Sequence, residues 1–153
     1  MIATNALVQA MLDLLAADTA TLGSVTAMKL HLAKNSFVPG PGLVLASLTP
    51  AAFTGSTAKS AGTGTQNVYF DPLTSALLIE ILEPVGGWTW ICTVDPATPG
   101  ETIFGVYLTD NAGAVLYGAQ LLPTPVLISA AGDGLNFSTA RFMLALSPFG
   151  PGQ

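Results

Sequence analysis

The sequence predicts a mainly β protein, a single β-sandwich or jelly-roll-like barrel with a short N-terminal helix. From residue 24 onward, short apolar segments recur at regular intervals, which is the pattern of strands in sandwiches and barrels. The chain contains 16 glycines and 11 prolines, which favour the many turns that such a fold needs. Asp110-Asn111-Ala112-Gly113 lies between two of the apolar segments and predicts a β-hairpin.

Composition divides the chain into three parts. Residues 1–23 form a predicted helical segment, residues 24–146 a β domain, and residues 147–153 an extended tail rich in proline and glycine. A chain of 153 residues is long enough to bury a core as one domain without disulfides. We therefore expect a single β domain with two short extensions.

The N-terminal segment has the pattern of an amphipathic helix. Thr4 or Asn5 can cap it, and Leu7, Met11 and Leu14 recur on one face. This apolar face suits packing on the sheet of the same chain, and it equally suits packing against a neighbouring subunit. Both alternatives stay open from the sequence.

The β domain is expected to begin with a half-exposed strand. Apolar Met28, Leu30 and Leu32 alternate there with polar Lys29, His31 and Lys34. A rigid loop and a short apolar strand over Leu43–Leu45 follow. Thr49 to Thr54 predicts a turn of helix with Pro50 at its first position. Residues 55–64, which are rich in glycine, serine and threonine, predict a loop.

The remaining strands are expected at 67–70, 76–82, 88–94, 102–109, 114–121, 126–129 and 136–146. The first three are expected to form a meander. Residues 83–87, Glu-Pro-Val-Gly-Gly, offer the residue types that a hairpin turn needs. We therefore expect each of these three strands to pair with the next.

The chain carries little charge. Half of its residues are hydrophobic and only 8% are charged, against about 25% in typical soluble domains. With a net charge of −5 and four basic residues, it lacks the clustered lysines and arginines that bind phosphates, so nucleic acid is not an expected partner. Residues 35–58 and 111–132 are uncharged, but prolines interrupt both, so no membrane span is expected. We expect these two stretches to be either core or covered by neighbours.

No residue pattern predicts an enzyme. Ser56-Thr57-Ala58-Lys59 matches the S-x-x-K motif of serine acyl transferases, but the accompanying S-D-N and K-T-G motifs are absent. Glu80 and Glu83 are three residues apart on a strand, which places them on opposite faces. We therefore assign no catalytic residue and expect no cofactor.

The single histidine and the single cysteine do not predict a metal site. His31 is expected on the solvent face of its strand between two lysines, and no second ligand type gathers near it in the sequence. Cys92 lies in an apolar strand, where it is typical of a small buried hydrophobic residue. No metal is expected.

Two tryptophans lie on one face of a predicted strand. Trp88 and Trp90 are two residues apart, and further aromatic residues, Tyr69, Phe104, Tyr107 and Tyr117, occupy neighbouring strands. Three roles are open: core residues of a sandwich, half of a subunit interface, or a platform on which sugars stack. The candidate interface residues are Leu7, Met11, Leu14, Phe53, Trp88 and Trp90.

Four segments together resemble a group of small virion proteins of tailed phages. They are KLHLAKN at 29–35, LASLTPAAFTG at 45–55, FGVYLTD at 104–110, and residues 116–126. The group has a similar layout, with an N-terminal helix, a strand, a loop with an L-T-x-A-x-F-T-G segment, and a hairpin that ends in a proline-bounded strand. This chain departs from the group at Ser56, where an aromatic residue usually follows F-T-G. The resemblance implies a structural protein of the virion.

The sequence therefore predicts a non-enzymatic capsid decoration (cement) protein. We expect it to assemble as a homotrimer on the lattice of the major capsid protein, with neither nucleic acid nor membrane as a partner. A charge-poor surface suits broad, flat contacts, in which ion pairs would add little. The expected location is the capsid surface of the virion, after synthesis in the host cytoplasm. The alternatives are a tail or fibre component, and a carbohydrate-binding receptor module that uses Trp88 and Trp90.

Overall fold

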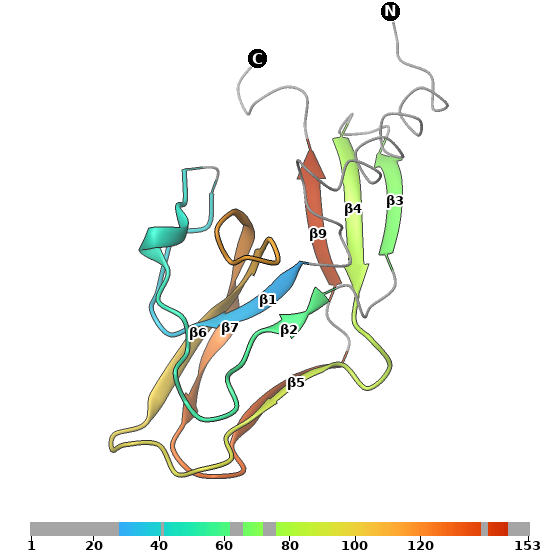
Figure 1. Cartoon of the computed structure of the whole chain (residues 1–153). Coiled ribbons are helices and arrows are strands. Elements are labelled where there is room, and N and C mark those ends of the chain that lie inside the picture. The colour runs from blue at the N-terminus through green and yellow to red at the C-terminus, as the bar shows by residue number, and fades with distance from the viewer. Residues whose placement is uncertain (1–27, 41, 62–65, 72–75, 139–140, 147–153) are drawn as a thin grey trace, which may run out of the picture.

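The computed structural model describes residues 28–40, 42–61, 66–71, 76–138 and 141–146 (Figure 1). In chain order the elements are β1 (Lys29–Ala33), η2 (Leu45–Ser47, a 3-10 helix), β2 (Lys59–Ser60), β3 (Gln66–Asp71), β4 (Ala76–Leu82), β5 (Trp88–Ile91), β6 (Glu101–Thr109), β7 (Leu116–Ile128), β8 (Gly134–Phe137) and β9 (Arg141–Leu146). The described part is thus mainly β, as the sequence predicts. The predicted helix within residues 1–23 and the tail at 147–153 lie outside the described residues.

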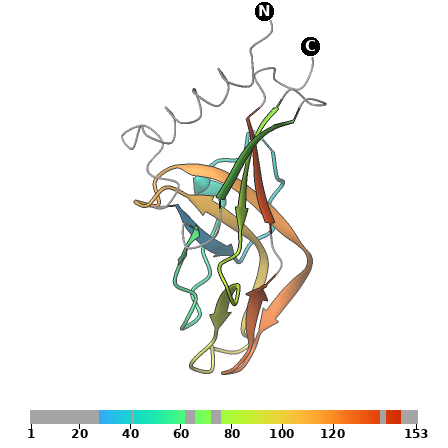
Figure 2. The same ribbon diagram turned by 90° about the vertical axis from the view of Figure 1, so that its right-hand side faces the viewer.

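The strands form three antiparallel sheets with the orders β2-β1-β6-β7, β3-β4-β9 and β5-β8. Figures 1 and 2 show the sheet of β3, β4 and β9 standing beside the four-stranded sheet, with the β5–β8 ribbon below. The four-stranded sheet ends in β2 on one side and in β7 on the other, so the described strands do not close into a barrel. None of the helical stretches in the described residues has the length and apolar character needed to cross a membrane.

β1 forms as its alternating sequence predicts. Leu30 and Leu32 are each 1% exposed, while Lys29 and His31 are only partly buried. The whole strand pairs with β6, and its first two residues also pair with β2. Alternation of apolar and polar residues has therefore positioned one face of β1 in the core.

Two local predictions between β1 and β2 are wrong. Leu43–Leu45 is not a strand, because the only regular element there is η2. Thr49 to Thr54 is not helical, because this segment runs along the end of β1. The amide of Lys34 donates to the carbonyl of Thr49, and the amide of Ala51 donates to that of Leu32, both at 2.9 Å. Pairing with a distant strand has overridden the local preference for a helical turn.

The predicted meander is also wrong in part. β4 pairs with β3, as expected, but its other neighbour is β9, and β5 pairs with β8. The turn before β5 does form, with the amide of Gly87 donating to the carbonyl of Pro84 at 2.8 Å. After this turn the chain leaves the β3–β4 hairpin. β5 pairs with β8 instead, and its Trp88 and Trp90 are buried in the main core.

β7 joins two segments that the sequence analysis separates. It is one strand of 13 residues, whose pairing with β6 shifts register between Ile103 and Gly105. Pro123 and Pro125 lie in this irregular part, where β7 has no assigned partner residues in β6. Proline is tolerated there because it lacks the amide hydrogen that a sheet ladder uses. The predicted hairpin at Asp110–Gly113 is confirmed, and it connects β6 to β7. The last expected strand, 136–146, is divided into β8 and β9.

The four-stranded sheet is apolar on both faces. The main cluster contains Met28, Leu30, Leu32, Phe53, Ala61, Trp88, Trp90, Cys92, Ile103, Val106, Leu108, Ile128 and Leu135. A second cluster contains Ala33, Phe37, Leu48 and Tyr107. Neighbouring residues of β6, such as Val106 and Tyr107, belong to different clusters and therefore lie on opposite faces. The loop between β1 and β2 supplies Phe37 and Leu48 to cover the second face.

Candidate contact surface

Trp88 and Trp90 lie in the core, which decides between the three roles left open by the sequence. They are 2% and 0% exposed. Their indole N–H groups donate to the carbonyls of Ser60 (3.2 Å) and Thr57 (2.9 Å), and the Trp90 ring meets Phe137 edge-on with centroids 5.8 Å apart. As interface or sugar-stacking residues, both tryptophans are therefore wrong predictions. Their shared face was read correctly, but it is the inner face of β5.

Phe53 is likewise a core residue, 5% exposed within the main cluster. A side chain buried in its own chain cannot contact a partner, so this candidate interface residue is also corrected. Leu7, Met11 and Leu14 lie outside the described residues. None of the six predicted interface residues is thus found on the described surface.

His31 is more enclosed than the sequence predicts. Its ring stacks on Tyr107, with centroids 4.8 Å apart and planes 9° from parallel. Its Nε2 lies 3.0 Å from the Thr109 hydroxyl oxygen, and that hydroxyl donates to the carbonyl of Asp110 at 2.9 Å. Because the hydroxyl proton is already used, Nε2 must be the donor to Thr109.

The environment of His31 favours the neutral ring. Removal from water lowers the pKa of His31 below its usual 6.5, and the positive charge of Lys29 lowers it further. Burial also raises the pKa of the Tyr107 hydroxyl above its usual 10.0. His31 is therefore a neutral hydrogen-bond donor in the sheet. Among the residues that the structure describes, no three His, Cys, Asp or Glu residues gather where they could hold a metal ion.

Cys92 is buried and 1% exposed, as the sequence predicts. Its thiol donates to the carbonyl of Val94 at 3.0 Å. A thiol in this position is held away from solvent, which makes it a packing residue and not a nucleophile.

A polar hollow of about 550 Å³ has Lys34, Asp95 and Glu101 among its lining residues. One carboxylate oxygen of Glu101 accepts from the amide of Ala52 at 2.8 Å, and one of Asp95 accepts from the amide of Ala131 at 2.7 Å. Both carboxylates thus hold loops in place. These hydrogen bonds account for both carboxylates without an acid–base role.

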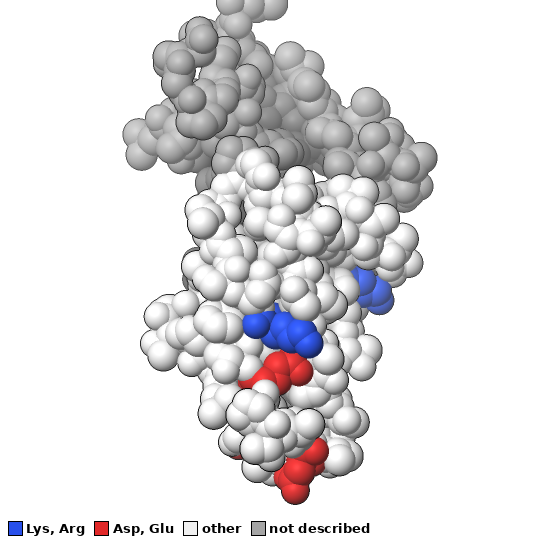
Figure 3. Space-filling view, turned by 90° about the vertical axis from the view of Figure 1, so that its left-hand side faces the viewer, with Lys and Arg blue, Asp and Glu red and all other residues white. Residues whose placement is uncertain are grey.

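The two uncharged stretches are mostly at the surface of the single chain. Residues 35–58 and 111–132 contain large exposed side chains, among them Val38 (84% exposed), Val44 (57%) and Val115 (51%). Figure 3 shows one face of the molecule, on which charged side chains lie in the middle and lower parts and the upper described part is uncharged. We call residues 36–40 and 42–48, which include η2, the apolar loop surface.

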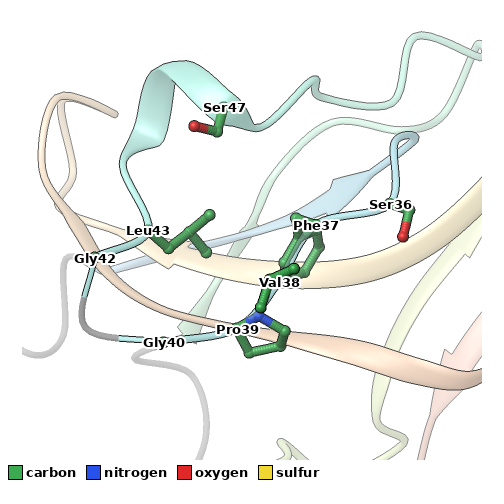
Figure 4. A pocket seen from close by; sticks show the side chains of 8 residues that line it. All are labelled: Ser36, Phe37, Val38, Pro39, Gly40, Gly42, Leu43 and Ser47. Carbon is green, nitrogen blue, oxygen red and sulfur yellow. The ribbon is translucent and has the colours of Figure 1, made fainter.

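A shallow hollow of about 420 Å³ lies in the apolar loop surface. Its wall consists of Ser36, Phe37, Val38, Pro39, Gly40, Gly42, Leu43 and Ser47, which include no charged side chain (Figure 4). The loop is held at its base by Asn35, whose side-chain oxygen accepts from the Thr49 amide at 2.6 Å and whose amide group donates to the Ser47 carbonyl at 2.9 Å. The surface is therefore a fixed, uncharged projection.

The sequence predicts that residues 35–58, which contain this loop, are core or covered by neighbours, but none of the six candidate interface residues lies in the loop. The available signal was the run Val38-Pro39-Gly40-Pro41-Gly42, which contains no charge and no periodicity that would bury it. No protein-family model matches the sequence, and neither a curated protein nor a solved structure matches it significantly. Function is therefore inferred from the residues, their geometry and the resemblance described above.

Proposed function

We propose that this chain is a non-enzymatic virion structural protein, and specifically a capsid decoration protein that acts as a homo-oligomer on the major capsid lattice. The observation that carries the proposal is the surface position of the two uncharged stretches. They expose Val38, Val44 and Val115 in the single chain. Exposed apolar surface that forms a patch is typical of contacts with other proteins, and the proposal assigns these residues to such a patch.

The apolar loop surface suits a broad protein contact better than a small-molecule site. It projects from the sheet, and its hollow is shallow. Among the described residues of the wall, Ser36 and Ser47 are the ones with polar side chains. Small-molecule sites usually enclose most of the ligand and place several polar groups around it. A flat contact gains its free energy from burying apolar area, for which charged groups are not needed.

The polar residues support a structural role in the same way. His31 is engaged with Tyr107 and Thr109, and the carboxylates of Asp95 and Glu101 accept from backbone amides. General acid–base catalysis needs a group that is free to exchange a proton with a bound substrate. These groups are instead parts of the scaffold.

The proposal is supported by the resemblance to small tailed-phage virion proteins. It includes synthesis in the host cytoplasm and a final position on the capsid surface. The finer architecture belongs to it as well: a two-layer β-sandwich, and an N-terminal helix whose apolar face contacts a neighbouring subunit. A tail or fibre component remains the second candidate, because it would use the same kind of uncharged contact. The carbohydrate-binding candidate is dropped, since Trp88 and Trp90 are enclosed.

Binding to capsids tests the proposal. Purified chain is mixed with heads and with tails of the virion that encodes it, and bound protein is measured by sedimentation and located by electron microscopy. We expect saturable binding to heads, weakened by Val38→Asp in the apolar loop surface. Val85→Asp is the matched control, because Val85 is fully exposed in the turn before β5. Binding to tails alone would favour the second candidate, and binding to neither would contradict both.

A further inference from the structure

β7 is an edge strand among the strands that the structure describes. It pairs with β6 on one side and with none of the other described strands on its second side. At the opposite end of this sheet, β2 is only two residues long and includes Lys59. Short strands and lysines are common protections against unwanted strand pairing. One edge of the sheet is thus protected, whereas β7 presents a long edge.

Only the first part of β7 can accept another strand. Pro123 and Pro125 lack amide hydrogens, and they lie in the part of β7 where the register with β6 is interrupted. Leu116–Leu121 precedes them and contains no proline. It pairs with β6 at every residue except Tyr117, where the register shifts a second time. Alternate amide and carbonyl groups of this segment point away from β6, where they can form a further ladder.

The segment Leu116–Leu121, which we call the β7 edge, carries no charge that would repel another strand. Its side chains reach both apolar clusters: Leu116, Ala119 and Leu121 pack against the second cluster, and Tyr117 packs against the main one. All four remain partly exposed. An added strand would cover their open sides and extend both clusters.

We propose that the β7 edge pairs antiparallel with the β7 edge of a second copy of this chain. A two-fold axis perpendicular to the sheet relates the two copies. The two four-stranded sheets then form one continuous sheet, in which the same face of each copy lies on the same side. The side chains of the second cluster then meet their own counterparts, as do those of the main cluster. Such a contact is self-complementary, which an isologous contact requires.

The charge distribution favours a second copy as the occupant. The chain has a net charge of −5, so two copies repel each other where their carboxylates come close. Residues 111–132 carry no charge, and at the β7 edge identical surfaces can meet without repulsion.

This inference goes beyond the proposed function, because it concerns how copies of the chain join and not what they decorate. A two-fold contact produces a dimer, whereas a trimer requires a head-to-tail contact between two different surfaces. The stoichiometry in solution therefore separates the β7 contact from the homotrimer predicted from the sequence. Capsid binding tests the decoration role independently of either result.

The experiment measures mass and amide exchange together. Light scattering after size exclusion gives the mass of the wild-type chain over a range of concentrations, and hydrogen–deuterium exchange followed by mass spectrometry reports on peptides that contain the β7 edge. We expect a dimer, with exchange in 116–121 slowing as the dimer forms. Gln120→Lys places an exposed lysine on the edge and is expected to raise the dimer dissociation constant by about tenfold or more.

Ala131→Lys is the control, because it adds the same charge at an exposed loop position outside β7 and should leave the dimer intact. Far-ultraviolet circular dichroism shows whether both variants keep the wild-type fold. Gln120→Glu is the second variant, and it should also dissociate the dimer. A wild-type monomer, a trimer, or a dimer in which exchange within 116–121 is independent of concentration would each overturn the proposal.

Discussion

The ring of Phe37 lies directly against Gly105. A methyl group at Gly105 would come within 2.8 Å of two carbon atoms of this ring and within 2.6 Å of the Gln120 carbonyl oxygen. Gly105 on β6 thus provides the space in which the loop between β1 and β2 packs on the sheet. Phe37 fills this space and is 8% exposed.

Gly105→Ala should therefore destabilise the protein. The added methyl group meets backbone as well as the ring, so the structure must shift to accommodate it. We expect a loss of about 3 kcal/mol in the free energy of unfolding, measured by urea denaturation. Gly40→Ala is the control, because a methyl group there meets no atom within 4 Å. Equal stabilities of the two variants would contradict the role given to Gly105.

Trp90→Phe should destabilise the protein through a lost hydrogen bond and lost packing. The indole N–H of Trp90 donates to the Thr57 carbonyl, and the side chain is fully buried. Phenylalanine leaves this carbonyl without its donor, which typically costs about 1–3 kcal/mol. Equilibrium unfolding followed by circular dichroism measures the loss. Val85→Ala, at a fully exposed position, should change the free energy of unfolding little. An unchanged midpoint for Trp90→Phe would contradict the packing described.

Sequence patterns predicted the fold where a local signal coincides with the tertiary environment. The alternation in β1 and the Asp110–Gly113 turn both survive in the structure. Local patterns fail at Thr49–Thr54. Proline and threonine predict a helix start there, but pairing with the end of β1 determines the conformation. The pairing of β5 with β8 connects residues far apart in the chain, and no local pattern encodes such a partner.

The candidate contact surface was less predictable than the fold. Two tryptophans on one face of a strand indicate a buried core face and an exposed aromatic platform equally well, because both have the same period of two. Only the position of β5 inside the molecule decides between them. The uncharged stretches were expected to be either core or covered by neighbours, and the structure places Val38, Val44 and Val115 at the surface of the single chain. Whether neighbours cover these residues stays a prediction.

Asp133→Ala should weaken the loop between β7 and β8. The Asp133 carboxylate accepts from the amides of Ser129 and Ala130 and from the Ser129 hydroxyl, at 2.8–3.0 Å. These hydrogen bonds hold the pKa of Asp133 below its usual 3.8. We expect a lower melting temperature at pH 7 for the alanine variant, with Asp133→Asn intermediate because its amide oxygen still accepts. The difference should diminish as the pH falls through the lowered pKa. A constant difference down to pH 2 would argue against the carboxylate.

His31 should make stability depend on pH between about 5 and 7. Because burial and Lys29 lower the pKa of His31 in the folded chain, protons bind more readily to the unfolded chain in this range. The stabilising contribution is complete above the unfolded pKa of about 6.5, and it is lost as the pH falls through the lower folded pKa. We expect the free energy of unfolding to decrease from pH 7 to pH 5 in urea titrations. His31→Gln removes the titrating group and should flatten this decrease. Asp110 and Asp133, whose pKa values lie below 3.8, stay ionised throughout the range and do not contribute. An identical slope in the glutamine variant would mean that another group titrates.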